Sequence, residues 1–394
     1  MTNFLKIFNS KNILFVLIFI VSISQLLKFY SFYIEYSEWQ YTDWLINYQG
    51  GFIRRGLIGE ILFKIYHTFN IDLSILVLIT VSTLILFISF LLVKTIHHIS
   101  NSYLDILTFL SPGFFLYPLM NSEVVGRKDI LMISAIGFFC FFGNRMKKNF
   151  LLVTLISLLL LTSLSHTAFL FYSPYLIFIY YLIMKKKNFY ISSLEKIILS
   201  LTLILMFSLI FFNQGNQSQV DEICNSIKMY VLENCSNRGQ MVWLSGNLEN
   251  YLFQKINIGY NFYKTSLIYI FSFLAVFFFL GLKVYNSKIS KQNKDIFFGK
   301  NPLFIFLLLF LFTGPVYIIG LDWGRYIYIS YSCIFFITIF CFKEKLLISN
   351  YDLKLKKYLF FLLVIVYSFT WTFPFYNANN LKLVLKKPIN NLFK

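Results

Sequence analysis

Charged residues are scarce in this chain. Only 13% of its 394 residues are Asp, Glu, Lys or Arg, whereas 58% are hydrophobic. A soluble globular domain carries about 25% charged residues. Many of the apolar runs are long enough to cross the hydrocarbon core of a bilayer, which is about 30 Å thick. The composition therefore excludes an ordinary soluble domain. It predicts an all-α, polytopic integral membrane protein that forms a single transmembrane domain over residues 1–394.

Common signatures of soluble enzymes and of metal sites are also missing from the sequence. It contains no Gly-rich nucleotide-binding loop and no nucleophile elbow. Its five cysteines do not have the spacing of a zinc site. We therefore expect neither a metal nor another cofactor.

The net charge of +18 would suit a nucleic-acid-binding protein, but the distribution of the charge indicates another origin. Lysines and arginines lie in short clusters between apolar runs, and no basic stripe is interleaved with aromatic residues. Such clusters are typical of cytoplasmic loops under the positive-inside rule. We expect no nucleic-acid partner, and the clusters serve to orient the chain.

This orientation gives eleven expected spans, with the N-terminus in the cytoplasm and the C-terminus outside. No small-residue cleavage site follows the first apolar run, which is therefore interpreted as a retained span rather than a signal peptide. No internal repeat of the inverted-transporter kind is visible. The expected spans are 13–33, 73–93, 104–121, 130–142, 150–166, 168–184, 194–212, 263–282, 302–320, 326–342 and 358–374.

Two outer loops are large, loop one at 34–72 and loop four at 213–262. Loop four contains Cys224 and Cys235, which would face an oxidising compartment. A disulfide between them is expected there, with two unpaired thiols as the alternative.

Three short charged segments interrupt the apolar sequence, and all three fall on the expected outer side. They are 50–56 (Gly-Gly-Phe-Ile-Arg-Arg-Gly), 126–129 (Gly-Arg-Lys-Asp) and 322–325 (Asp-Trp-Gly-Arg). A charge within a bilayer costs about 2.5–3.5 kcal/mol on insertion scales. Because the outer side should be poor in cations, these segments are the candidates for function.

The first charged segment follows the acids of loop one. Arg54 and Arg55 point in different directions on a helix, so they could bind two phosphates, or a phosphate and a carboxylate. The apolar residues that follow repeat at helical spacing and predict an interfacial amphipathic helix. The alternative is an ordinary surface helix whose arginines contact lipid headgroups.

Two acids of loop one are candidates for contact with a substrate. Asp43 is nearest to the arginines in sequence and could act as a general base, while Glu38 would help to bind the substrate. The alternative for Asp43 is a helix cap or an ion pair with Arg54 or Arg55.

The second charged segment and a nearby hairpin add further candidates. Arg127 and Lys128 lie outside against the orientation rule and are expected to bind substrate, while Asp129 could simply cap the next helix. His166 lies in a sharp outer hairpin and could be a base or a phosphate ligand. A hydrogen-bonded structural histidine is the alternative.

The third charged segment closes a tight outer hairpin. Arg325 begins a span and needs a partner, for which Asp322 is nearest. Trp323 could stack on a sugar face or could belong to the aromatic belt of the membrane interface. Arg325 is assigned to catalysis, whereas Asp322 and Trp323 are assigned to substrate binding.

With its spans, its large late outer loop and its outward arginines, the chain resembles bacterial O-antigen and capsule repeat-unit polymerases. More broadly, it is similar to membrane glycosyltransferases of the GT-C type, whose first outer loop carries acids. The resemblance implies a multi-pass enzyme of the bacterial inner membrane that acts on polyprenyl-diphosphate-linked glycans, with its active site facing the periplasm.

The resemblance implies no nucleotide sugar and no obligatory metal, and as partners it implies membrane lipid and a chain-length regulator or flippase. Two alternatives stay open at this point. One is a GT-C-type transferase that uses a polyprenyl-phosphate sugar, and the other is a lipid-linked-oligosaccharide flippase.

Overall fold

A computed structural model describes residues 10–99, 102–245, 262–290, 296–297, 301–348 and 351–375. The end of loop four at 246–261 and the C-terminus, which is expected outside, lie beyond these residues. The described chain is predominantly helical, as the composition predicted. Its only strands are β1 (Lys288–Ile289) and β2 (Leu347–Ile348), which pair antiparallel.

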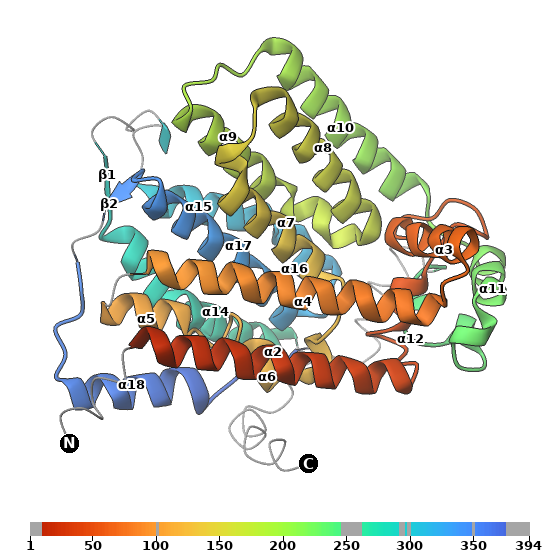
Figure 1. The fold of residues 1–394 in the computed structure, drawn as a ribbon, viewed down its shortest axis with the longest axis horizontal. Coiled ribbons are helices and arrows are strands. Elements are labelled where there is room, and N and C mark those ends of the chain that lie inside the picture. The colour runs from red at the N-terminus through yellow and green to blue at the C-terminus, as the bar shows by residue number, and fades with distance from the viewer. Residues whose placement is uncertain are drawn as a thin grey trace. The chain divides into compact units, whose positions relative to one another are not determined.

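Seven helices are long and apolar enough to cross a membrane, counted over the described residues. This finding confirms the prediction of several helices long and apolar enough to cross a membrane, and it is compatible with a multi-pass arrangement. The 3-10 turn η4 (Thr167–Tyr172) runs directly into the α9 helix and forms one span with it. The helices are α2 (Ser10–Ile34), α4 (Leu73–His98), α8 (Lys148–Ser165), α9 (Ser173–Lys186), α10 (Ser193–Phe212), α14 (Phe262–Tyr285) and α17 (Trp323–Lys343) (Figure 1).

The other four expected spans are shorter helices or are interrupted. Residues 104–121 form α5 (Tyr103–Phe109) and α6 (Tyr117–Met120), and 302–320 form α15 (Pro302–Leu311) and α16 (Gly314–Ile319). Both interruptions lie at a proline next to a glycine, Pro112–Gly113 and Gly314–Pro315, because proline lacks the N–H that continues a helix. The remaining two are α7 (Asp129–Phe142) and α18 (Lys357–Phe369).

The chain forms two compact units. Unit 1 consists of Met1–Gln25, Ile88–Val124 and Gly259–Lys394, and unit 2 consists of Leu26–Phe87 and Val125–Ile258. The long helices α2 and α4 contribute to both units, because the boundaries after Gln25 and after Phe87 fall within them. Loop one, the second charged segment and loop four belong to unit 2, while the third charged segment belongs to unit 1.

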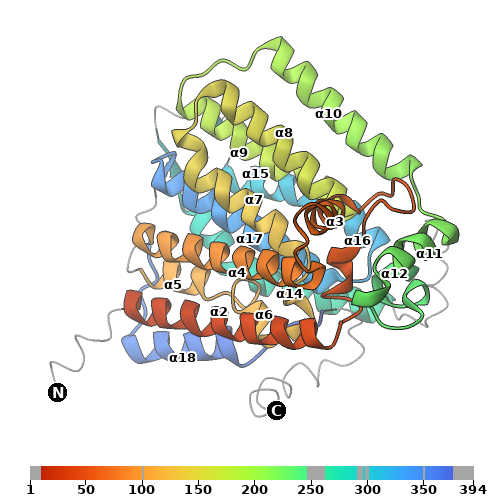
Figure 2. The same ribbon diagram turned by 45° about the vertical axis from the view of Figure 1, so that its right-hand side comes forward.

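Unit 2 is built around α7, α8 and α9, which pack against one another, with α10 and α3 (Leu57–Phe69) against α8. Between α2 and α3 the chain forms the 3-10 turn η1 (Thr42–Leu45), on which α3 also packs. The short elements of loop four lie beside α3 in both views (Figure 2). They are α11 (Gln217–Ser226), η5 (Lys228–Tyr230), η6 (Cys235–Asn237) and α12 (Gly239–Val242).

Unit 1 is centred on α17, of which 19 residues are buried. A helix that is apolar on all sides belongs in the interior of a protein. The α14 helix packs against α17, α5 and α15, while α16 packs against α17 and α18 against α5.

The interruption between α5 and α6 is held by hydroxyl groups. Tyr331 donates to the Thr108 carbonyl at 2.6 Å, and Ser111 donates to the Val276 carbonyl at 3.2 Å. Broken helices are tolerated at membrane depth only where such partners satisfy the freed backbone groups.

Candidate functional site

The turn η1 brings loop one against the second charged segment. The indole N–H of Trp44 donates to the Gly126 carbonyl at 2.6 Å, and both groups are buried. Gly126 has a φ of +74°, which favours glycine. A Cβ at this position would also overlap the ring of Phe29. Only glycine fits here, and it allows two segments that are 82 residues apart to make contact.

One carboxylate and two cations form the buried centre of this region. Arg55 Nη2 lies 2.9 Å from Asp43 Oδ1, and Lys128 Nζ lies 3.5 Å from the same oxygen. The side chains of Asp43, Arg55 and Lys128 are 1%, 8% and 0% exposed. Lys128 also donates to the Arg55 carbonyl at 3.2 Å. The predicted alternative for Asp43, an ion pair with Arg55, is therefore present, and Lys128 joins it.

The stability of this buried group depends on whether each of its charges has a partner of opposite sign. Buried charges require partners, and removing one partner of a buried pair typically costs about 3–5 kcal/mol. The Nε atom of Arg55 is buried and has no hydrogen-bond acceptor in the described part of the chain. Arg55 therefore keeps one N–H that can donate to a further anionic group.

The predicted amphipathic helix is α3, which is fixed at its first turn to loop one. The buried Glu60 accepts from the Tyr48 backbone N–H at 3.0 Å and from Gln49 Nε2 at 3.3 Å. Gly59 allows the close approach, since a Cβ there would overlap the Ile46 carbonyl. Ile61 on the other face of the helix is 39% exposed. Part of the apolar surface of α3 is therefore exposed, and its position at a membrane interface stays a prediction.

Arg54 and Arg55 diverge as predicted, although they lie in a turn before α3 and not on a helix. Arg54 Nη2 donates to the Trp243 carbonyl of loop four at 2.9 Å, whereas Arg55 turns to Asp43. Glu38 forms an ion pair with Arg238 of loop four at 3.2 Å. Residues predicted to bind substrate thus hold loop four against loop one.

Arg127 lies beside loop one as well. Its guanidinium carbon is 5.5 Å from the centre of the Trp39 ring, in a cation–π contact, and the residue is buried. Both cations of the second charged segment are therefore directed toward loop one.

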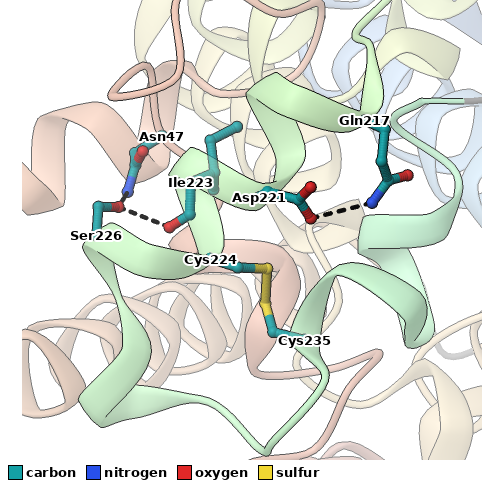
Figure 3. The surroundings of a disulfide bond; sticks show 7 residues. All are labelled: Asn47, Gln217, Asp221, Ile223, Cys224, Ser226 and Cys235. Carbon is teal, nitrogen blue, oxygen red and sulfur yellow. Dashed lines mark hydrogen bonds between the residues drawn. A yellow bond between two sulfur atoms is a disulfide. The ribbon is translucent and has the colours of Figure 1, made fainter.

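A disulfide joins Cys224 of α11 to Cys235 of η6, with Cα atoms 5.9 Å apart. Figure 3 shows that Ser226, two residues after Cys224, accepts from Asn47 Nδ2 of loop one at 3.0 Å. The disulfide therefore closes the segment of loop four that contacts loop one. In the same region a Cβ at Gly50 would overlap the Gln219 carbonyl, so the two backbones touch.

Asp129 does not occupy the cap position that was suggested for it, whereas His166 caps a turn of its own. Asp129 is the first residue of α7, and the cap position before it is Lys128, which makes no side-chain cap bond. The buried His166 accepts from the Ala168 N–H at its Nδ1 at 3.3 Å and caps η4, while its ring stacks on Phe169. These are the interactions of the structural alternative for His166.

The third charged segment forms its own ion pair in unit 1. Arg325 Nη1 lies 3.3 Å from Asp322 Oδ2, as the sequence predicted, with side chains 3% and 26% exposed. Trp323 is buried, and its ring contacts Tyr269 and Tyr317. Its indole N–H donates to the Gly320 carbonyl at 3.1 Å. The indole therefore packs inside unit 1.

Residues 371–375 cover the start of α17. The Gly324 N–H donates to the Phe375 carbonyl at 3.2 Å, and Phe373 stacks on Tyr117 with ring centres 4.4 Å apart. A Cβ at Gly324 would overlap the Pro374 carbonyl. Residues 373–375 therefore pack directly on Gly324, the residue before Arg325.

Sequence reasoning missed a second buried ion pair in unit 1. Lys283 of α14 pairs with Asp105 of α5, and both residues are buried. The Lys283 ammonium group also lies 4.5 Å from the centre of the Phe342 ring. An acid at the start of an apolar run was the signal that could have indicated the pair.

A polar cluster at the start of α4 was missed as well. Burial raises the pKa of Asp72, but hydrogen bonds from the Ser74 hydroxyl and from the Ile75 and Ser74 N–H groups outweigh it, so the pKa lies below 3.8. Burial raises the pKa of the neighbouring Tyr230 of loop four to about 12. The Asp-x-Ser sequence before a helix was the available signal.

Comparisons with protein-family models, with curated proteins and with solved structures each gave no match. Within the described ranges, no three His, Cys, Asp or Glu side chains gather as a possible metal site.

Proposed function

We propose that this chain is a membrane glycosyltransferase that polymerises polyprenyl-diphosphate-linked oligosaccharide repeat units, of O-antigen or capsule, at the periplasmic face of the bacterial inner membrane. One observation carries the proposal. Asp43 of the first outer loop is held by Arg55 and by Lys128, which come from two charged segments that membrane topology alone does not require. The finer count of eleven spans, with the N-terminus inside, belongs to the same proposal.

The residues fit a glycosyl transfer in which all atoms and charges balance. Asp43 takes the proton of an acceptor hydroxyl while that oxygen forms a bond to the anomeric carbon. The bond from that carbon to the diphosphate breaks, and the diphosphate leaves with the electron pair. Lys128 and the free N–H of Arg55 stabilise the charge on the leaving group. His166 is the alternative base.

Arg325 has the second role in this scheme. It is a buried cation of unit 1, and its carboxylate partner Asp322 is partly exposed. A guanidinium of this kind can exchange a carboxylate for a phosphate with the same two-pronged geometry. We assign Arg325 to the lipid diphosphate of a glycan substrate.

A single-sugar GT-C transferase is the second candidate, and the placement of α3 favours it. The helix begins two residues after Arg55, and Glu60 and Gly59 fix it to loop one. A phosphate held at Arg55 would therefore lie next to an amphipathic helix that can rest on the membrane surface. A flippase is the third candidate.

One reconstitution experiment distinguishes the three candidates. The purified chain in proteoliposomes receives a fluorescent oligosaccharide on a short polyprenyl diphosphate, or a polyprenyl-phosphate sugar with an acceptor. A ladder of repeat units supports the polymerase, whereas addition of one sugar from the monophosphate supports the second candidate. Movement of the labelled lipid between leaflets without covalent change would refute both transferases.

Matched variants test the site itself. Asp43→Asn should abolish transfer, whereas Asp221→Asn, an exposed acid of loop four, should leave it unchanged. Transfer by Asp43→Asn at the wild-type rate would exclude Asp43 as the base and direct the search to His166. Cysteine labelling at positions 48 and 322 should report the same, outer side of the membrane. A cytoplasmic signal at 322 would contradict the orientation.

A further inference from the structure

A hollow of about 560 Å³ lies at the turn between α7 and α8 in unit 2. It has an aromatic wall, and its rim carries two cations. Its lining residues are Phe138, Phe142, Arg145, Met146, Lys147 and Phe150.

The cations of this turn differ in how they are neutralised. Lys148 forms an ion pair with Glu195 at 3.2 Å and donates to the Tyr190 carbonyl at 2.7 Å. Arg145 and Lys147 are exposed, and neither has an ion pair or side-chain hydrogen bond within the residues that the structure describes. The lining contains no acid. The hollow therefore carries two uncompensated positive charges.

The shape of the turn is fixed by its neighbours. Lys187 at the end of α9 donates to the Met146 carbonyl at 2.6 Å. A Cβ at Gly143 would be 2.5 Å from Ile183 Cδ1, so the turn lies directly on α9. Two side chains at the end of α9 therefore hold the turn, and its cations project from a defined position.

The aromatic wall extends away from these cations along the helices. The rings of Phe138 and Phe142 lie 5.4 Å apart, and Phe150 of α8 is 61% exposed. A turn between two apolar helices in a membrane lies at the depth of the lipid headgroups. A ligand that fits such a place has an anionic head and an apolar chain.

We propose that this hollow binds an anionic phospholipid. The phosphate lies between Arg145 and Lys147, and the first part of an acyl chain lies on the wall of Phe138, Phe142 and Phe150. Basic pockets between membrane helices are suited to such headgroups, and each Lys or Arg near an anionic surface favours binding by about fivefold. Two cations should therefore favour phosphatidylglycerol over phosphatidylcholine by roughly 30-fold. The proposal is independent of the glycosyl-transfer chemistry.

Native mass spectrometry of the full chain, released from micelles that contain either lipid, tests the proposal. The wild type should retain one phosphatidylglycerol at concentrations where phosphatidylcholine is lost. The double variant Arg145→Gln with Lys147→Gln should lose this preference. The double variant Lys354→Gln with Lys356→Gln, which removes two exposed lysines of unit 1, should retain it.

Two further arms separate charge from packing and lipid from free phosphate. Exchanging the two cations, Arg145→Lys with Lys147→Arg, should preserve the preference, because charge and exposure are kept. Inorganic phosphate at the lipid concentration should not displace the bound lipid. Equal retention of both lipids by the wild type, an unchanged preference in the Gln double variant, or displacement by phosphate alone would each overturn the proposal.

Discussion

The shared carboxylate of Asp43 makes a sharp energetic prediction. In Asp43→Asn, Arg55 and Lys128 lose their common counter-charge while they remain buried. Breaking a buried ion pair by removing one partner costs about 3–5 kcal/mol, and we expect a loss of stability in this range. Lys128→Met removes only one of two cations, and Asp43 keeps Arg55 at 2.9 Å. We expect the smaller cost of about 1.5–3 kcal/mol that is typical of a lost charged hydrogen bond.

The double variant decides whether these residues act as a unit. In Asp43→Asn with Lys128→Met, the uncompensated ammonium is absent, so part of the cost of the first substitution disappears. Residues in contact show coupling of about 0.5–3 kcal/mol, whereas distant sites add to within about 0.5 kcal/mol. We expect the double variant to lose at least 1 kcal/mol less than the sum of the two single losses.

Unfolding in mixed micelles with increasing sodium dodecyl sulfate measures the free energies. Trp fluorescence is a suitable signal, because the Trp44 indole lies beside this group. Asp221→Asn is the control, and its effect should stay within about 0.5 kcal/mol of the wild type. Additive losses in the double variant, or a change in Asp43→Asn no larger than in the control, would refute the reasoning.

Three further predictions concern other parts of the chain. Arg325→Ala should lower polymerisation by about 10²–10³, and Arg325→Lys should recover only part of it; a normal product ladder in the Ala variant would assign Arg325 to packing. Cys224→Ser should lower thermal stability by about 2–3 kcal/mol, because the bond closes a short loop; an unchanged unfolding midpoint without reductant would contradict this. The pKa of Asp72 is lowered on folding, so its carboxylate stabilises the folded state fully above pH 3.8, which is the usual pKa. This stabilisation is lost as the pH falls through the lower pKa that Asp72 has in the folded state. Asp72→Asn should therefore reduce the loss of stability at low pH. Parallel pH–stability curves for the variant and the wild type would exclude a stabilising role of Asp72.

Local signals in the sequence were sufficient to predict the long helices and the ion pairs between residues that are close in sequence. Long apolar runs predicted the seven long helices, and the Asp322–Arg325 pair follows from its spacing of three residues on a helix. The broken spans show where hydropathy misleads. The run over 104–121 is predominantly apolar, but Pro112 prevents a continuous helix.

Contacts between distant segments could not be predicted in the same way. The sequence offered Arg55 as one possible partner of Asp43, since the two are 12 residues apart. It did not indicate Lys128, which contacts Asp43 from the N-cap of α7. Its position depends on the carbonyl of Gly126, which is fixed only when Trp44 docks. The same holds for Asp105 and Lys283, which are separated by 178 residues.

The contacts between loop one and loop four impose an order on synthesis. Asn47 bonds to Ser226 across 179 residues, and Arg54 to Trp243 across 189. At about 5–20 residues per second, the ribosome needs roughly 10–35 s to make the intervening chain. In the proposed orientation, loop one lies on the outer side of the membrane during this interval, before its contacts with loop four can form. A chaperone or the translocation machinery that shields loop one for these seconds would protect the chain at its most vulnerable stage.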